Sequence, residues 1–233
     1  VSGTLAASPV TVASNAVLTG TGILGGGATI LPGGKLIPPG GMTFSNKLAL
    51  VSANCFFDLS SSPAGGNDQL VLRGGLLALT NTQNFVFNLT DGFLGPGTYV
   101  LIDGGTNTAS SAPAIASNLP VGSRQDFAFA TPPGQVLLNV TGNVASLVWR
   151  GTNGSAWDTT TTNWLNAGSA DAFWPFDAVR FDDSATNGVV NLVGSVQPRS
   201  VLVSNVSRAY SVNGGSLDGT TSLVKHGAGM LTL

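Results

Sequence analysis

The sequence predicts an all-β protein, in which short parallel β-solenoid rungs lead into longer strands, sandwich-like or continuing the solenoid, before a second, tryptophan-rich β module. Charged residues make up only 9% of the 233 residues, and 32 residues are glycine. An ordinary soluble domain has about 25% charged residues. Short apolar runs alternate with glycine- and asparagine-containing turns, and no stretch has helical periodicity, so we expect almost no helix.

The composition argues against several classes of protein. A net charge of −2 with 42% hydrophobic residues disfavours disorder. The nine basic residues are spread along the chain, so we expect no nucleic-acid partner. No apolar run has the length of a membrane-spanning helix, so we expect no membrane-spanning segment in this chain. The single cysteine, Cys55, lies beside Phe56 and Phe57, which predicts a buried, unreactive thiol.

Residues 1–50 have the spacing of a narrow solenoid. Apolar pairs begin about every six or seven residues, the length of a strand and a tight turn in a parallel β-helix. These pairs are Val10–Val12, Val17–Leu18, Ile23–Leu24, Ile30–Leu31, Leu36–Ile37 and Leu48–Leu50. Such a rung buries its inward side chains only by stacking on the next one. The alternative is a meander of antiparallel hairpins, but these strands are too short for a good meander.

Longer strands are predicted from Cys55 to about residue 102. Within the run 85–89, strongly apolar residues alternate with less apolar ones, which is the period of a strand with one buried face. The segment 103–125 has weak patterning and is expected to form loops.

A change of composition divides the chain. All four tryptophans lie between Trp149 and Trp174. We therefore predict a first domain, 1–145, that contains the solenoid and closing β region. The second domain, 146–233, is a tryptophan-rich β module that ends in an open hairpin.

Both extremities of the sequence resemble strands. Ser222–Leu233 has the pattern of a hairpin, with a glycine turn at 227–229, and Val1–Leu5 is strand-like. We expect both to present unpaired β-edges, as cut ends of a longer or polymerised chain would. The side chains predicted at this assembly interface are Val1, Leu5, Val10, Val12, Leu223, Lys225, Met230, Leu231 and Leu233.

Two stretches of the second domain resemble repeats of large bacterial autotransporter-type surface proteins. Residues 149–164, Trp-Arg-Gly-Thr-Asn-Gly-Ser-Ala-Trp-Asp-Thr-Thr-Thr-Thr-Asn-Trp, followed by Asp177–Asp183, resemble the leader of their repeat module. Ser222–Leu233 resembles the autotransporter-associated β-strand repeat, Leu-x-Lys-x-Gly-x-Gly-x-Leu-x-Leu. His226 and Met230 depart from its usual polar positions.

The first domain resembles the other half of such a module. Residues 1–22 are similar to the continuation of the repeat into its solenoid, and the segments 67–71 and 98–103 to its closing part. The halves therefore stand in permuted order. The resemblance implies a secreted, elongated, β-solenoid-rich surface or fibre protein of a bacterium, with no catalytic residues to carry over.

Residue types for catalysis are sparse. The only histidine, His226, is expected in an exposed turn, and no Gly-x-Ser-x-Gly motif accompanies it. All eleven acidic residues are aspartates, so a glycosidase would need an aspartate pair. The best acidic cluster is Asp182 and Asp183 with Asp171 and Asp177. Calcium could bind there, but the spacing fits no calcium loop, so we predict no metal site and no cofactor. Because catalytic motifs are lacking, we also predict that the chain is not an enzyme.

The tryptophans Trp149, Trp157, Trp164 and Trp174 have two interpretations. They could form a platform that stacks on a surface glycan, or they could be large apolar anchors of a module that has few leucines. The sequence favours the anchors.

The leading functional hypothesis is an extracellular structural subunit. It would be secreted or lie on a bacterial cell surface, and would self-associate head to tail into a fibre or stalk by completing β-edges. The alternative is a carbohydrate-binding or adhesin module with the tryptophans as its binding face. A β-helix polysaccharide lyase or hydrolase is disfavoured, because the chain has no glutamate.

Overall fold

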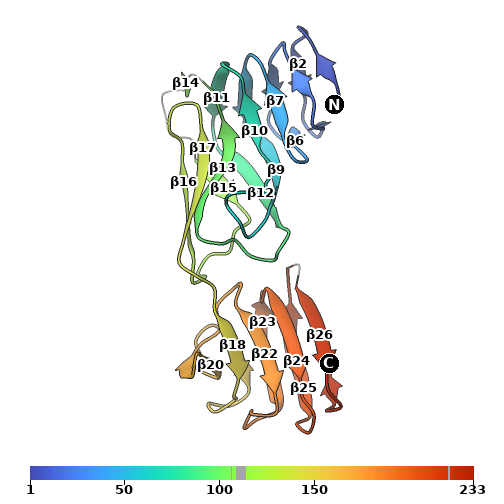
Figure 1. The fold of residues 1–233 in the computed structure, drawn as a ribbon, viewed down its shortest axis with the longest axis vertical. Coiled ribbons are helices and arrows are strands. Elements are labelled where there is room, and N and C mark those ends of the chain that lie inside the picture. Colours follow the sequence, from blue (N-terminus) through green and yellow to red (C-terminus); the bar gives the residue numbers. More distant parts are fainter. Residues whose placement is uncertain (106, 109–113, 220) are drawn as a thin grey trace. The chain divides into compact units, whose positions relative to one another are not determined.

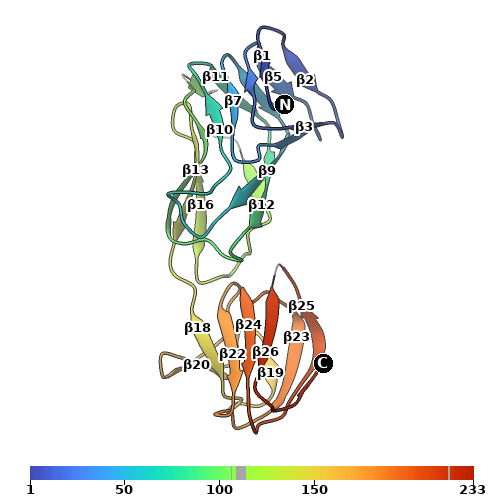
Figure 2. The ribbon, with the colours of Figure 1, turned by 45° about the vertical axis from the view of Figure 1, so that its right-hand side comes forward.

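A computed structural model describes residues 1–105, 107–108, 114–219 and 221–233. The described residues contain no helix, and parallel strands dominate, which confirms the predicted all-β class. None of them forms a helix of the length and hydropathy that a bilayer crossing needs. The chain divides into two compact units, shown in Figures 1 and 2. Unit 1 comprises Val1–Thr90, Leu94–Leu119 and Asp126–Thr141, and unit 2 comprises Asp91–Phe93, Pro120–Gln125 and Gly142–Leu233.

Unit 1 is a parallel β-solenoid with three faces. Successive strands enter sheets A, B and C in turn, so each strand pairs with the strand three places later. The strands of sheet A are β1 (Thr4–Leu5), β4 (Ile23–Leu24), β7 (Met42–Phe44), β10 (Leu70–Leu72) and β13 (Gly97–Asp103). Those of sheet B are β2 (Val10–Val12), β5 (Ala28–Ile30), β8 (Leu48–Val51), β11 (Leu76–Thr80) and β14 (Asn107–Thr108). Those of sheet C are β3 (Val17–Thr19), β6 (Lys35–Ile37), β9 (Asn54–Leu59), β12 (Gln83–Leu89) and β15 (Ile115–Ser117).

The parallel pairing decides between the two predicted arrangements of residues 1–50. Each predicted apolar pair forms one side of a rung, and three sides make one coil; a meander would have paired consecutive strands. Strands β14 and β15 lie in the segment 103–125, so the expectation of loops there is wrong for those strands. Residues 106 and 109–113 lie outside the described part of that segment.

The core of unit 1 consists of alternate residues that point into the coil. In β12, Phe85 and Phe87 are buried, whereas Val86 between them is only partly buried. Their rings lie 5.4 and 6.1 Å from the ring of Phe57 on the preceding rung. The inward side chains of one rung thus pack on those of the next, which is how a solenoid forms a continuous core from short strands.

An antiparallel hairpin covers one end of unit 1. Strands β16 (Asp126–Ala130) and β17 (Val136–Thr141) pair with each other, and β17 pairs antiparallel with β13. From β16, Phe129 places its ring 6.1 Å from Phe85 and 6.2 Å from Phe87. The hairpin therefore extends sheet A and covers aromatic residues of the core.

Unit 2 is a second solenoid with two faces. The strands of sheet D that run parallel are β18 (Ser146–Trp149), β22 (Ala178–Asp182), β24 (Ser200–Ser204) and β26 (Ser222–His226). Two short strands, β20 (Trp164–Asn166) and β21 (Ser169–Asp171), extend it antiparallel beyond β18. Sheet E consists of β19 (Ala156–Trp157), β23 (Val189–Val196), β25 (Tyr210–Leu217) and β27 (Leu231–Thr232).

The last stretch of the chain is a solenoid corner, which corrects the predicted hairpin. Strand β26 pairs with β24 in sheet D, whereas β27 pairs with β25 in sheet E. Between them, Gly227 has a φ of +78°, and a Cβ there would lie 2.1 Å from the carbonyl oxygen of Asn205. The glycines therefore allow the chain to turn from one sheet to the other, close against the corner of the preceding rung.

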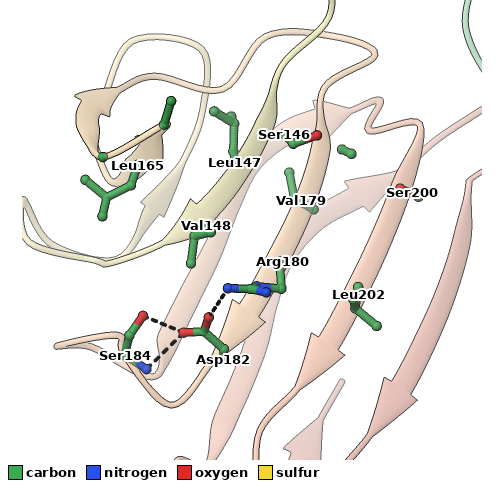
Figure 3. A pocket seen from close by; sticks show the side chains of 13 residues that line it. Ser146, Leu147, Val148, Leu165, Val179, Arg180, Asp182, Ser184, Ser200 and Leu202 are labelled. Carbon is green, nitrogen blue, oxygen red and sulfur yellow. Dashed lines mark hydrogen bonds and ion pairs between the residues drawn. The ribbon is translucent and has the colours of Figure 1, made fainter.

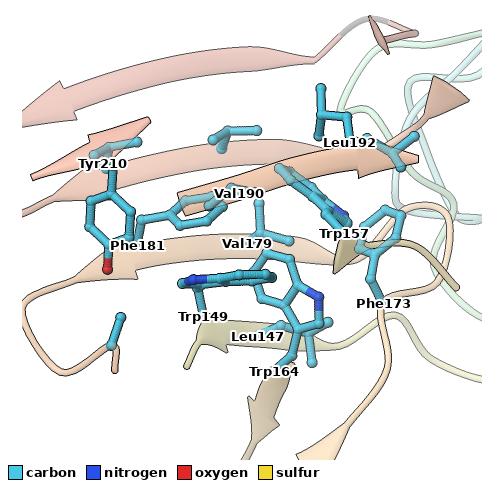
Figure 4. Close-up of a cluster of buried hydrophobic side chains, with 14 of the residues drawn as sticks. Leu147, Trp149, Trp157, Trp164, Phe173, Val179, Phe181, Val190, Leu192 and Tyr210 are labelled. Atoms are coloured by element: carbon cyan, nitrogen blue, oxygen red, sulfur yellow. The ribbon is translucent and has the colours of Figure 1, made fainter. Parts of the chain in front are cut away.

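Three tryptophans form the core of unit 2, as Figure 4 shows. Trp149, Trp157 and Trp164 are fully buried, and Trp164 lies edge-on to the other two, with centroid distances of 4.9 and 5.1 Å. Phe181 lies 5.5 Å from the ring of Trp164. These three indoles are core anchors and cannot stack on a glycan, because no face of them is open to solvent. Trp174 is partly exposed and lies outside this cluster.

Candidate functional site: unpaired solenoid edges

The first rung of unit 1 has an unpaired edge on all three faces. Strands β1, β2 and β3 pair with β4, β5 and β6, and no other described strand pairs with them. At this edge Val1 and Leu5 are exposed, as predicted, and Val10 is partly exposed. Val12 is buried, so its side chain belongs to the core of the rung and only its backbone lies at the edge.

The last rung of unit 2 has a second unpaired edge. Within the described residues, β26 pairs only with β24, and β27 only with β25. Met230 and Leu233 are 64% and 77% exposed, and Leu223 is 39% exposed. Leu223 continues an inward row whose earlier members, Val179 and Val201, are buried. The last rung thus exposes the kind of side chain that the preceding rungs bury.

Lys225 and Leu231 occupy inward rows of the same rung. Lys225 follows Val203, and Leu231 follows Tyr210. The Lys225 ammonium donates to the carbonyl oxygens of His226 and Gly227, both at 2.7 Å. A charged residue that points inward on an edge strand discourages indiscriminate strand pairing. Here the charge is held at the corner, so the aliphatic stem rather than the ammonium continues the row.

A shallow groove of about 690 Å³ lies on the outer face of sheet D (Figure 3). Val148, Leu165 and Leu202 line it with aliphatic surface. At one end Arg180 pairs with Asp182 at 2.7 Å, and Ser184 donates to the same carboxylate. Although partial burial acts to raise it, these hydrogen bonds and the arginine lower the pKa of Asp182. The lining has no aromatic side chain for a sugar to stack on.

The aspartates considered for calcium are held separately. Asp177 is buried, and Arg124 donates to both of its carboxylate oxygens at 2.9 Å. The amide of Ala145 donates to one of these oxygens at 2.7 Å, and the amide of Trp174 to the other at 3.0 Å. Arg124 also pairs with Asp171 at 2.8 Å. Burial outweighs these contacts and raises the pKa of Asp177.

Asp183 caps the corner of the next rung. Its carboxylate accepts from the amides of Val206, Ser207 and Arg208, the last at 2.7 Å. These hydrogen bonds lower the pKa of Asp183 to about 2. Because Arg124 binds Asp171 and Asp177 while Asp183 binds backbone amides, the aspartates of the predicted cluster do not converge on one site. No group of three His, Cys, Asp or Glu side chains in the described residues could hold a metal ion.

Cys55 and His226 are the other side chains that were considered for catalysis or metal binding. Cys55 is buried, as predicted, and burial raises the pKa of its thiol. His226 is exposed at the end of β26. Sequence reasoning missed the contact of Arg124 with Asp177 and the capping by Asp183, since each joins segments more than twenty residues apart. Of these two, only the capping by Asp183 could have been predicted, from a strand spacing typical of parallel pairing.

Comparisons with known proteins add no assignment. No family model, no curated protein and no solved structure matches this chain.

Proposed function

We propose that this chain is an extracellular structural subunit of a bacterial surface, which assembles end to end by completing the unpaired β-edges of its two solenoid units. The observation that carries the proposal is that a whole rung of each unit lies at an unpaired edge. At the other ends, a hairpin covers the last strand of sheet A and β20 and β21 extend sheet D, whereas β14, β15 and β19 are edge strands of sheets B, C and E among the described strands. The opposite edges, β1–β3 and β26–β27, are left unpaired among the described strands.

Backbone chemistry supports the same role. Each unpaired edge strand presents a row of amide and carbonyl groups, which a further strand can satisfy without any change in the solenoid. The secreted location rests on the resemblance of residues 149–164 and Ser222–Leu233 to autotransporter repeats. A glycan-binding role loses its main support, because Trp149, Trp157 and Trp164 are buried.

Electron microscopy and light scattering of the purified chain test this proposal. Particle length should increase with protein concentration. Leu223→Lys should shorten the particles, because it places a charge in the exposed inward row of β26. Val189→Lys is the matched control, since Val189 is 46% exposed but lies on β23, which has a partner on each side. Monomers at every concentration, or equal effects of the two variants, would contradict the proposal.

A further inference from the structure

We propose that Asn153 is a site of spontaneous covalent modification, at which the backbone nitrogen of Gly154 attacks the side-chain amide and closes a succinimide ring. The site lies in unit 2, in the turn that follows β18. It is independent of the proposed edge assembly, because the reaction involves a single turn of one chain.

The reaction needs only groups of the chain and water. The Gly154 nitrogen forms a bond to Cγ of Asn153, the bond between Cγ and Nδ2 breaks, and Nδ2 leaves as ammonia with the proton of the attacking amide. Water then adds to one of the two carbonyl groups of the ring, which opens to aspartate or isoaspartate. Glycine favours the first step, because without a Cβ it neither shields its nitrogen nor restricts the backbone rotation that brings this nitrogen to Cγ.

The chain has three Asn-Gly pairs, which begin at Asn153, Asn187 and Asn213. The dipeptide is the same in each, so the surrounding contacts decide which one reacts. Asn153 and Gly154 are both exposed in their turn. A Cβ atom on Gly154 would meet nothing within 4 Å, so no neighbouring rung obstructs rotation of this backbone.

The pair at Asn187 is held by its neighbours. The Asn187 side chain accepts from the amide of Val189 at 2.9 Å, and its backbone carbonyl accepts from the indole of Trp149 at 2.8 Å. A Cβ atom on Gly188 would lie 2.2 Å from the carbonyl oxygen of Ala209. Rotation towards the ring geometry would therefore break hydrogen bonds and collide with the adjoining rung.

The pair at Asn213 is held by its strand. Asn213 lies within β25 and pairs with Asn191 of β23. A Cβ atom on Gly214 would lie 2.6 Å from the carbonyl oxygen of Leu192. Although Asn213 is exposed, its backbone cannot rotate without disrupting the pairing of the two strands.

The contacts of Asn153 lie at the surface. Its Nδ2 donates to the hydroxyl and the carbonyl oxygen of Thr162 at 2.8 and 3.0 Å, and its backbone amide donates to Oδ1 of Asn163 at 2.8 Å. The two contacts with Thr162 are exposed, so water competes for them. After the reaction a carboxylate replaces the Nδ2 donor and faces the Thr162 carbonyl oxygen. The turn should then loosen from Thr162 and Asn163.

Peptide mapping by mass spectrometry tests the site on the folded chain, incubated in mildly alkaline buffer. Asn153 should convert at least about ten times faster than Asn187 and Asn213, a ratio that corresponds to a barrier difference of about 1.4 kcal/mol. In urea, where the folded contacts are lost, the three rates should converge. Similar rates in the folded chain would overturn the proposal, as would an Asn153 that reacts in urea but is stable when folded.

Asn153→Gln is the matched control variant, because its longer side chain keeps the amide but would have to close a larger ring, which forms more slowly. All four tryptophans belong to unit 2, so their fluorescence reports on the unit that contains the turn. After incubation, the urea midpoint should fall in the original chain and stay constant in the variant. A constant midpoint in both chains, with Asn153 converted, would overturn the loosening of the turn.

Discussion

The three buried indoles of unit 2 differ in the bonding of their nitrogen atoms. Trp149 donates its Nε1 hydrogen to the carbonyl oxygen of Asn187 at 2.8 Å. The Nε1 atoms of Trp157 and Trp164 are buried without a hydrogen-bond partner. A buried N–H group without a partner costs free energy that a benzene ring would not. The three tryptophans are thus alike in packing and unlike in polar energetics.

Replacing these tryptophans with phenylalanine should separate the two effects. Trp149→Phe should lower the free energy of unfolding by about 1 kcal/mol more than Trp164→Phe, because only the first removes a hydrogen bond. Both variants lose similar packing volume. Urea titration followed by circular dichroism measures the difference. An equal or larger loss for Trp164→Phe would show that packing alone determines the cost.

Asp183 links stability to pH. Its pKa is lowered to about 2, whereas an ordinary aspartate has a pKa of about 3.9. The folded state therefore favours the charged form, and the stabilisation is complete above about pH 4 and lost as the pH falls towards 2.

Asp183→Asn should destabilise the chain at pH 7, because the amide provides only one acceptor for the three backbone N–H groups. At pH 2 the difference between the variant and the original chain should be much smaller, since about half of Asp183 is then protonated in the folded state and most of the pH-linked stabilisation is lost. Urea midpoints at the two pH values give the measurement. A difference that stays constant from pH 7 to pH 2 would contradict the capping role.

At the scale of the element, close contact between rungs restricts their corners. A Cβ atom at Gly75, just before β11, would lie 1.0 Å from the carbonyl oxygen of Asn46 on the preceding rung. Gly65 lies in a loop of the same unit, where a Cβ atom would meet nothing within 4 Å. Neither glycine has a positive φ, so the comparison isolates the effect of the neighbouring rung.

Gly75→Ala should therefore destabilise unit 1 by about 2 kcal/mol or more, because the rungs must move apart. Gly65→Ala should be neutral or stabilise by up to about 1 kcal/mol, since alanine reduces the entropy of the unfolded chain. Thermal unfolding of the two variants, followed by circular dichroism, provides the comparison. Equal midpoints would show that the corner has room to relax.

Local patterns predicted the strands but not all of their partners. The run Val10–Val12 and the alternation in 85–89 correspond to β2 and β12, because burial of alternate residues is visible in the sequence. The pattern of Ser222–Leu233 did not distinguish a hairpin from a corner, since both need a glycine turn between two apolar runs. Strands β14 and β15 were missed, because most of their residues are small or polar.

The same limit applies to the candidate site. The exposed apolar residues of the last rung were predicted from their place in a strand-like run. Composition favoured the tryptophans as apolar anchors, and Trp149, Trp157 and Trp164 are buried. The burial of Val12 could not be deduced from spacing, because it depends on which rung lies beside it. The pairing of Arg124 with Asp177 joins positions 53 residues apart, and no local signal links them.

At the scale of the whole molecule, the unfolding of unit 2 can be followed separately from that of unit 1. All four tryptophans belong to unit 2, so tryptophan fluorescence follows that unit alone. Arg124 also belongs to unit 2, through the segment Pro120–Gln125, which is distant in sequence from its other residues. Its pairing with the buried Asp177 holds this segment to the rest of the unit.

Arg124→Met should lower the fluorescence-detected stability of unit 2 by about 3 kcal/mol, because the buried Asp177 carboxylate loses its partner. The matched control is Arg180→Met, whose side chain is 50% exposed and pairs with Asp182 on the surface. That change should cost less than about 1 kcal/mol. Urea titration of both variants measures the contrast, and similar losses would refute the importance of the buried pair.

The register of sheet D has a consequence for how such a chain can change in length. Ala178 pairs with Ser200, and Ser200 with Ser222, each a step of 22 residues. A duplication of that length would return every inward side chain of these strands of sheet D to its own row. A gain or loss of one residue inside a strand would exchange the inner and outer faces unless a β-bulge absorbs it, as the register shift between Leu192 and Ser195 of β23 does. Evolution should therefore lengthen or shorten this unit in whole multiples of one coil, with smaller insertions placed at corners or bulges.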